Sequence, residues 1–217
     1  MKYDDVFEIK LSDNEYVLKL RPGVREFLDM VSSMFELSIF TIGYREYAHK
    51  VVEKLGGFSR FSCVIAREDC LQKRQKTLDL VLSHKQRVLI VDDMEQVWEK
   101  CCKENLIKIK SYDFFPLKEG IVVENKMDKE LSRVFEMLRE VHNVFYDGNN
   151  DEDYGVKDAR EVLKRVLISR GLSCVSQEQY EELEDQKSVE VCRVKRLKIK
   201  FNGAWLEKSN KKIRLFG

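Results

Sequence analysis

Two apolar stretches that end in polar residues decide the fold: LSIFTIG at 37–43 and RVLIVDD at 87–93. Both are rich in β-branched residues and carry no charge in their interiors, which is typical of strands buried on both faces of a parallel sheet. Ligands of such sheets bind beyond the carboxyl ends of the strands. Thr41, after the first stretch, and Asp92-Asp93, at the end of the second, are therefore candidate ligand-binding residues.

The pattern around these stretches alternates strands with helices across short connections, which favours an α/β fold with a mostly parallel sheet. Apolar β-branched runs predict the strands, and apolar residues at i, i+3, i+4 and i+7 spacing predict the helices. We predict strands at 16–20, 37–42, 64–66, 87–91 and 106–110, and helices at 22–35, 45–55, 75–84, 94–104, 128–146 and 157–170.

The last third of the chain has a different pattern. An acid-rich run at 178–190 predicts an exposed helix. Apolar residues alternate with lysines at 197–201, and the Asn202-Gly203 that follows predicts a basic β-hairpin. We divide the chain into a domain at 1–146, an acidic linker at 147–156, and a helical segment with the basic hairpin at 157–217.

Composition excludes several classes of protein. Lys and Arg number 39 and Asp and Glu 38, so the net charge of +1 predicts no polyanionic partner for the chain as a whole. No apolar run is long enough to span a membrane, and the N-terminus has no apolar signal-peptide core. The six cysteines form no C-x-x-C pair, so we expect a reducing intracellular location and no zinc site.

The basic C-terminal end has two interpretations. The stretch VKRLKIK at 194–200 is compatible with a nuclear-import or nucleic-acid-binding surface. A strand hairpin whose lysines are solvated explains the same residues without any partner. We favour the second interpretation and expect no nucleic-acid partner.

The polar residues at the two strand ends predict a phosphate site. A hydroxyl at Thr41 and carboxylates at Asp92-Asp93 would flank one anion, and paired carboxylates favour a hard cation such as Mg²⁺. Lys76 lies between them in sequence and would meet the phosphate with its charge. A threonine at a strand end is more often structural, and an isolated lysine is nearly always exposed. The two adjacent aspartates are the stronger evidence, because burying two carboxylates without a cation or hydrogen-bond donors is costly.

Six blocks in a fixed order resemble the RNA polymerase II C-terminal-domain phosphatases of the haloacid dehalogenase superfamily, particularly the plant C-terminal-domain phosphatase-like proteins. They are YVLKLRPGVREFL, FELSIFTIGYREYAHKVVEKLGG, VIAREDC, QKTLDLVL, VLIVDDMEQVW and NLIKIKSYDFF. The resemblance is close over about 16–115 and looser through 128–146 and 157–170, which in such proteins leads into a BRCT domain. Residues 157–217 would then include a BRCT remnant.

The resemblance implies a haloacid-dehalogenase-like, Rossmann-type fold, a nuclear location, and Mg²⁺-dependent hydrolysis of phosphoserine in the polymerase repeat through an aspartyl-phosphate. It also implies roles for matched residues. Thr41, Lys76 and Asp92 would be catalytic, Gly43 and Arg67 would contact the substrate, and Asp93 with Asp92 would hold Mg²⁺; Trp98 is interpreted as a core residue.

The chain departs from the family in its first motif. Asp-x-Asp-x-Thr, whose first aspartate is the nucleophile, ends the strand at the middle of the family's sheet, and the motif is absent from residues 1–217. Met1 would therefore fall after the missing strand. Without it, either residues 6–11 fill the gap or the sheet is split and marginally stable.

Three functional hypotheses follow. The first is a truncated relative of a nuclear protein serine/threonine phosphatase, inactive because its nucleophile is missing. The second is a non-catalytic module that binds phosphoserine peptides or other protein partners. The third is an incomplete gene model of an active enzyme, with the missing strand encoded upstream.

Overall fold

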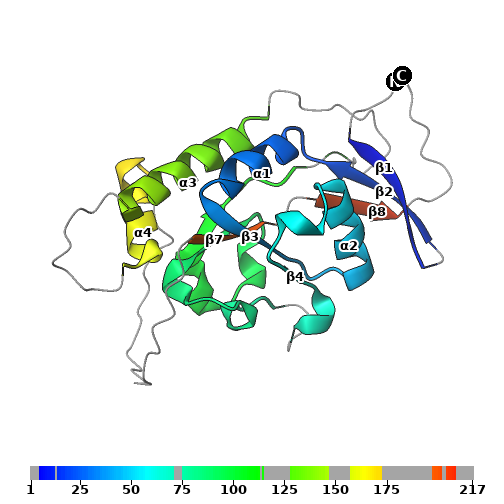
Figure 1. Cartoon of the computed structure of the whole chain (residues 1–217), viewed down its shortest axis with the longest axis horizontal. Helices are drawn as coiled ribbons and strands as arrows, with labels where there is room; N and C mark the ends of the chain where they lie inside the picture. The colour runs from blue at the N-terminus through cyan, green and yellow to red at the C-terminus, as the bar shows by residue number, and fades with distance from the viewer. Residues whose placement is uncertain are drawn as a thin grey trace.

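A parallel sheet lies at the centre of the molecule in the computed structural model (Figure 1). Its strand order is β4-β3-β7-β5-β6, and each neighbouring pair is parallel. The strands are β3 (Phe35–Phe40), β4 (Cys63–Ile65), β5 (Val88–Asp92), β6 (Leu106–Lys108) and β7 (Leu197–Phe201). The structure describes residues 5–12, 14–70, 75–112, 114, 128–146, 157–172, 197–201 and 204–208.

A second, antiparallel sheet has the order β1-β2-β8 and lies beside α2 (Figure 1). Its strands are β1 (Val6–Leu11), β2 (Asn14–Leu20) and β8 (Ala204–Lys208). The helices are α1 (Val24–Ser32), α2 (Arg45–Lys54), α3 (Glu130–Tyr146) and α4 (Ala159–Ser169). Short 3₁₀ turns are η1 (Phe58–Arg60), η2 (Arg67–Asp69), η3 (Leu78–Leu80), η4 (Lys85–Arg87), η5 (Glu95–Val97) and η6 (Lys100–Asn105).

The core divides along the two faces of the parallel sheet, because successive strand residues point to opposite faces. Leu37 and Ile39 of β3 join the apolar cluster that includes α1, α3 and α4. Phe40 and, from β5, Val88 and Ile90 join a second cluster formed mainly with the 3₁₀ turns. Packing on both faces of the sheet explains why β3 and β5 read as apolar runs in the sequence.

The predicted helices at 75–84 and 94–104 are wrong. The backbone N–H of Lys76 donates to the carbonyl oxygen of Val97 at 2.6 Å, and the N–H of Glu99 donates to Lys76 at 3.0 Å. This bridge between Lys76 and Trp98 holds both segments extended where an α-helix would need those groups for its own ladder. Only the turns η3, η5 and η6 form around it.

The predicted basic hairpin is also wrong. β7 enters the parallel sheet, where Ile199 lies opposite Leu37 of β3 and Leu89 of β5, whereas β8 pairs with β2. β7 therefore fills the middle of the parallel sheet. We expected that residues 6–11 would fill this place or that the sheet would be split. Residues 6–11 instead form β1, at the edge of the other sheet. The predicted linker at 147–156 and helix at 178–190 lie outside the described residues.

Candidate functional site

Thr41, Gly43 and Arg67 lie around one loop after β3. The backbone N–H of Thr41 donates to Ile65 at 2.9 Å, and its Oγ1 accepts the N–H of Gly43 at 3.0 Å. Arg67 holds the same loop, since its backbone N–H donates to Gly43 at 2.9 Å and its Nε to Ile42 at 2.6 Å. The Arg67 guanidinium stacks 4.4 Å from the ring centre of the exposed Tyr44. The loop thus places a hydroxyl and a cation at the carboxyl end of β3.

Gly43 packs too closely against α2 for any larger residue. A Cβ at this position would lie 2.7 Å from Cδ1 of Tyr47 and 3.2 Å from Oγ1 of Thr41. We expect Gly43→Ala to lower the free energy of unfolding by about 1–3 kcal/mol, because the Tyr47 ring must shift. Urea denaturation would measure this loss. The same substitution in a Tyr47→Ala background should lose clearly less, and an equal loss would contradict the steric explanation.

Lys76 and Asp92 form a buried ion pair at the end of β5. Nζ of Lys76 lies 2.6 Å from Oδ2 of Asp92, and both side chains are 1% exposed. The indole N–H of Trp98 donates to the same Oδ2 at 3.0 Å, and the backbone N–H of Met94 donates to Oδ1 at 2.9 Å. Three donors therefore compensate the buried carboxylate. The ammonium also lies 5.2 Å from the Trp98 ring centre and 5.7 Å from that of Phe40.

Asp93 is the partly exposed member of the acidic pair. Burial raises its pKa, and the negative charge of Asp92 raises the pKa further. Both oxygens of Asp92 accept hydrogen bonds, and Asp93 is the more exposed carboxylate of the pair. Mg²⁺ in proteins is commonly held by one or two carboxylates together with several waters, so the residue types of this pair fit the ion. The assignment of Mg²⁺ to Asp92 and Asp93 stays a prediction, as do the catalytic and substrate roles.

Trp98 has a positioning function that the sequence interpretation missed. It is a core residue, 3% exposed, and it packs edge-on against Phe40 at 5.3 Å between ring centres. Its N–H also fixes the orientation of the Asp92 carboxylate. A signal was present, because a buried indole N–H needs an acceptor and a buried aspartate needs donors.

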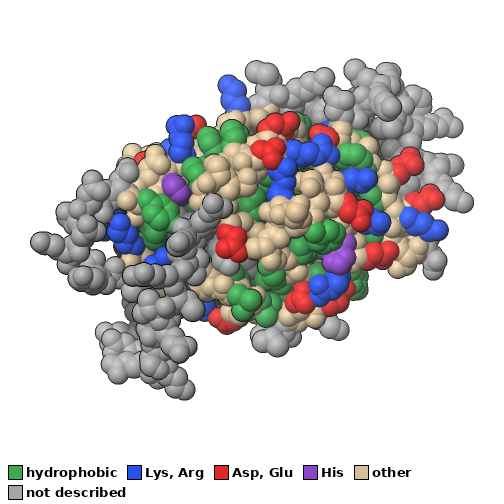
Figure 2. All heavy atoms as spheres, in the orientation of Figure 1, with side chains coloured by type: hydrophobic (Ala, Val, Ile, Leu, Met, Phe, Trp, Pro, Cys, Tyr) green, Lys and Arg blue, Asp and Glu red, His purple; other side chains and the backbone are tan. Residues whose placement is uncertain are grey.

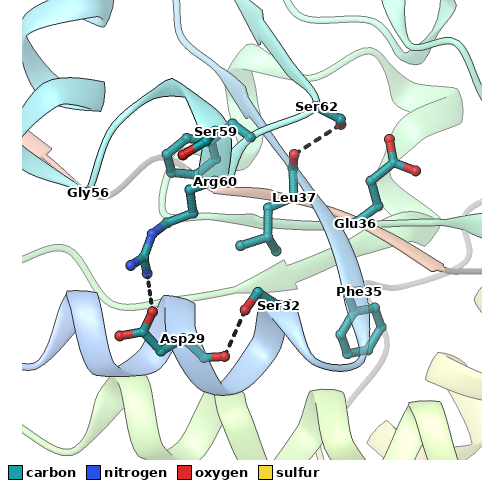
Figure 3. A pocket seen from close by; sticks show the side chains of 10 residues that line it. Asp29, Ser32, Phe35, Glu36, Leu37, Gly56, Ser59, Arg60 and Ser62 are labelled. Atoms are coloured by element: carbon teal, nitrogen blue, oxygen red, sulfur yellow. Dashed lines mark hydrogen bonds and ion pairs between the residues drawn. The ribbon is translucent and has the colours of Figure 1, made fainter.

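A hollow lies at the opposite end of β3 (Figure 3). Its volume is about 620 Å³. It is lined by Phe35, Glu36 and Leu37 at the start of β3 and by Asp29 and Arg60. The Asp29 carboxylate and the Arg60 guanidinium form an ion pair at 2.7 Å. None of the predicted site residues lines this hollow. Figure 2 shows acidic and basic side chains interspersed across one face of the molecule, in keeping with the balanced composition.

Comparisons with known proteins match the chain to one group. The sequence model of the family described as "NLI interacting factor-like phosphatase" matches residues 1–149. RNA polymerase II C-terminal domain phosphatase-like 4 of Arabidopsis thaliana is 36% identical over 166 residues, covering 70% of this chain and 37% of that protein. An RNA polymerase II C-terminal domain phosphatase of Caenorhabditis elegans is 29% identical over 183 residues, covering 75% and 28%.

A solved structure shares the fold. The structure of Fcp1, described as an essential RNA polymerase II CTD phosphatase, superposes with a TM-score of 0.63 at 23% identity, over 74% of this chain and 60% of that one. This likeness confirms the predicted haloacid-dehalogenase-like α/β fold. The chain spans roughly a third of the length of these two curated relatives. Because the family model covers well over half of the sequence, the chain belongs to the NLI interacting factor-like phosphatase family.

Proposed function

We propose that residues 1–217 bind phosphoserine peptides of the RNA polymerase II C-terminal-repeat type without hydrolysing them, in the nucleus. The observation that carries the proposal is the identity of the central strand. β7 lies between β3 and β5, where the family resemblance places the strand with the nucleophilic aspartate, and its sequence LKIKF contains no carboxylate. Without that nucleophile, the central strand offers no carboxylate to form an aspartyl-phosphate.

The loop after β3 supports binding. The Nε of Arg67 is engaged by Ile42, and among the described residues its two terminal nitrogens have no hydrogen-bond partner. A guanidinium held in this way can donate two parallel hydrogen bonds to a phosphate. The Thr41 hydroxyl belongs to the same loop and can donate as well, since it accepts the Gly43 N–H through its oxygen. Lys76 contributes differently: it is fully buried against Asp92 and would act on an anion only through its charge.

Binding and turnover are tested separately. Fluorescence anisotropy should detect a phosphoserine repeat peptide but not its unphosphorylated form, and phosphate release with Mg²⁺ should stay at the level without protein. Arg67→Ala should weaken binding about tenfold or more, because a hydrogen bond to a charged group contributes about 1.5–3 kcal/mol. Arg139→Ala is the matched control, since that exposed arginine on α3 pairs with Glu136.

Two results would overturn the proposal. Equal affinity for both peptides would remove the phosphoserine site. Phosphate release that Asp93→Ala abolishes would restore the alternative, an active enzyme. That alternative draws on one observation: the relatives are much longer than residues 1–217, so a first motif outside this sequence is compatible with the match.

A further inference from the structure

Two adjacent cysteines and a glutamate gather where the chain turns between β5 and β6. Glu99 directly precedes the turn η6, and Cys101 and Cys102 lie inside it. Their sulfur atoms and a carboxylate oxygen all lie within 4.8 Å of one another. The Cys101 Sγ lies 3.8 Å from the Cys102 Sγ and 3.7 Å from Oε2 of Glu99. In the part of the chain that the structure describes, this is the one such group of metal-ligating side chains.

These separations match those between ligands of one tetrahedral ion. Two sulfurs that each lie about 2.3 Å from Zn²⁺ at the tetrahedral angle are about 3.8 Å apart, and a sulfur and a carboxylate oxygen on the same ion are about 3.5 Å apart. A disulfide would need the two sulfurs at about 2.05 Å. We propose that Glu99, Cys101 and Cys102 bind Zn²⁺ or a similar thiophilic divalent cation, with water as the fourth ligand.

The backbone around the turn fixes these ligands in place. The N–H of Glu99 donates to the carbonyl oxygen of Lys76 at 3.0 Å, and the N–H of Cys102 donates to that of Glu99 at 2.9 Å. At the other end of η6, the fully buried Asn105 donates from Nδ2 to the carbonyl oxygen of Val88 at 2.7 Å. Because the turn is held at both ends, binding an ion requires little reordering of the chain.

The surroundings suit a site that is open on one side. Cys102 is fully buried and Glu99 half-buried, whereas Cys101 is exposed, so water can complete the coordination as it does in other sites with three protein ligands. The charge of Lys85 acts on both cysteines, but its ammonium pairs with Asp79 at 2.8 Å and can turn to solvent.

The residue types select the class of cation. Thiolate sulfur favours Zn²⁺ over Mg²⁺, so this site would not compete for the ion expected at Asp93. The Cys102 thiol is protonated in the absence of a metal, because burial raises its pKa to about 11. Binding therefore displaces thiol protons into solvent. The spacing of the six cysteines predicted no zinc site, since the two sulfurs here come from adjacent residues and not from a C-x-x-C pair.

Titration of the reduced, metal-free full chain with Co²⁺ tests the site, because tetrahedral Co²⁺–thiolate complexes absorb visible light. We expect one equivalent of Co²⁺ to develop the absorption band and Zn²⁺ to remove it by displacement. Cys101→Ser should weaken Co²⁺ binding about a hundredfold or more, because even the hydrogen-bond partners of metal ligands contribute about ten- to a hundredfold. Glu99→Gln should weaken it about tenfold or more. Cys63→Ser, at an exposed cysteine in β4, is the matched control and should change nothing.

Two results would overturn the proposal. One is a chain that develops no Co²⁺ band. The other is a band that Cys101→Ser leaves unchanged, since the ion would then be held by other cysteines. Cys101 and Glu99 lie outside the apolar clusters, so their substitutions test binding without removing part of the core. The metal site shares no residue with the proposed phosphopeptide site, so either proposal can fail alone.

Discussion

Replacing Asp92 with alanine is expected to lower the free energy of unfolding by about 3–5 kcal/mol, which is the typical loss when one partner of a buried ion pair is removed. The substitution leaves the Lys76 ammonium fully buried without its carboxylate. The Trp98 indole N–H and the Met94 amide lose their acceptor at the same time. Urea denaturation followed by fluorescence would measure the loss, and Trp98 would report the change in its surroundings.

Two matched variants isolate the ion pair. Asp93→Ala removes the neighbouring carboxylate, whose pKa is raised by burial and by the charge of Asp92. Its removal also relieves the repulsion between the two aspartates. We therefore expect the free energy of unfolding to change by no more than about 0.5 kcal/mol. The double variant Lys76→Met/Asp92→Leu should recover much of the lost stability, since apolar residues often replace buried ion pairs without loss. Equal losses in Asp92→Ala and Asp93→Ala would refute this account.

The second large effect is expected from Arg21→Met, at about 3 kcal/mol. Arg21 follows β2 and contacts Asp128, just before α3, through Nε at 2.5 Å and Nη2 at 3.1 Å. Its Nη1 also donates to the carbonyl oxygen of Lys110 at 2.7 Å. The two side chains are 7% and 8% exposed, so this bidentate pair joins three distant segments in a nearly dry environment. Thermal and urea unfolding would measure the loss.

The same pair predicts a dependence of stability on pH. Burial acts to raise the pKa of Asp128, but hydrogen bonds from Arg21 and from the Glu130 amide outweigh it, and the pKa lies below its ordinary value. A lowered folded-state pKa contributes stability that is present above the unfolded value of about 3.9 and is lost as pH falls through the folded value. The difference in stability between wild type and Asp128→Asn should therefore shrink between about pH 5 and pH 2, and a constant difference would contradict the linkage.

Most of the parallel sheet could be predicted because its strands are apolar runs that need no knowledge of their neighbours. β3, β4, β5 and β6 lie within a few residues of the predicted ranges. The helices at 75–84 and 94–104 could not be corrected from sequence, because the bridge between Lys76 and Trp98 joins residues whose pairing has no local pattern. Asn202-Gly203 gave a strong local turn signal, and long-range pairing of β7 outweighed it.

The sequence predicted which residues would lie near the strand ends, while their catalytic and substrate roles stay predictions. Thr41, Gly43 and Arg67 come together around one loop. Lys76 was expected to meet a phosphate, and the structure pairs it with Asp92. The three hydrogen bonds that Asp92 accepts could not be predicted from the sequence, because they depend on where the Trp98 indole lies. The charge of the central strand was also beyond sequence, since nothing local shows that LKIKF enters the sheet.

The late position of β7 has a consequence for synthesis of the protein. β5 leaves the ribosome about a hundred residues before β7, the strand that lies between it and β3, and β3 leaves still earlier. At roughly 5–20 residues per second, the nascent chain waits on the order of 5–20 s with the centre of its sheet incomplete. During that interval its unpaired strand edges are binding sites for chaperones, and slowing translation after Asp92 should increase their capture.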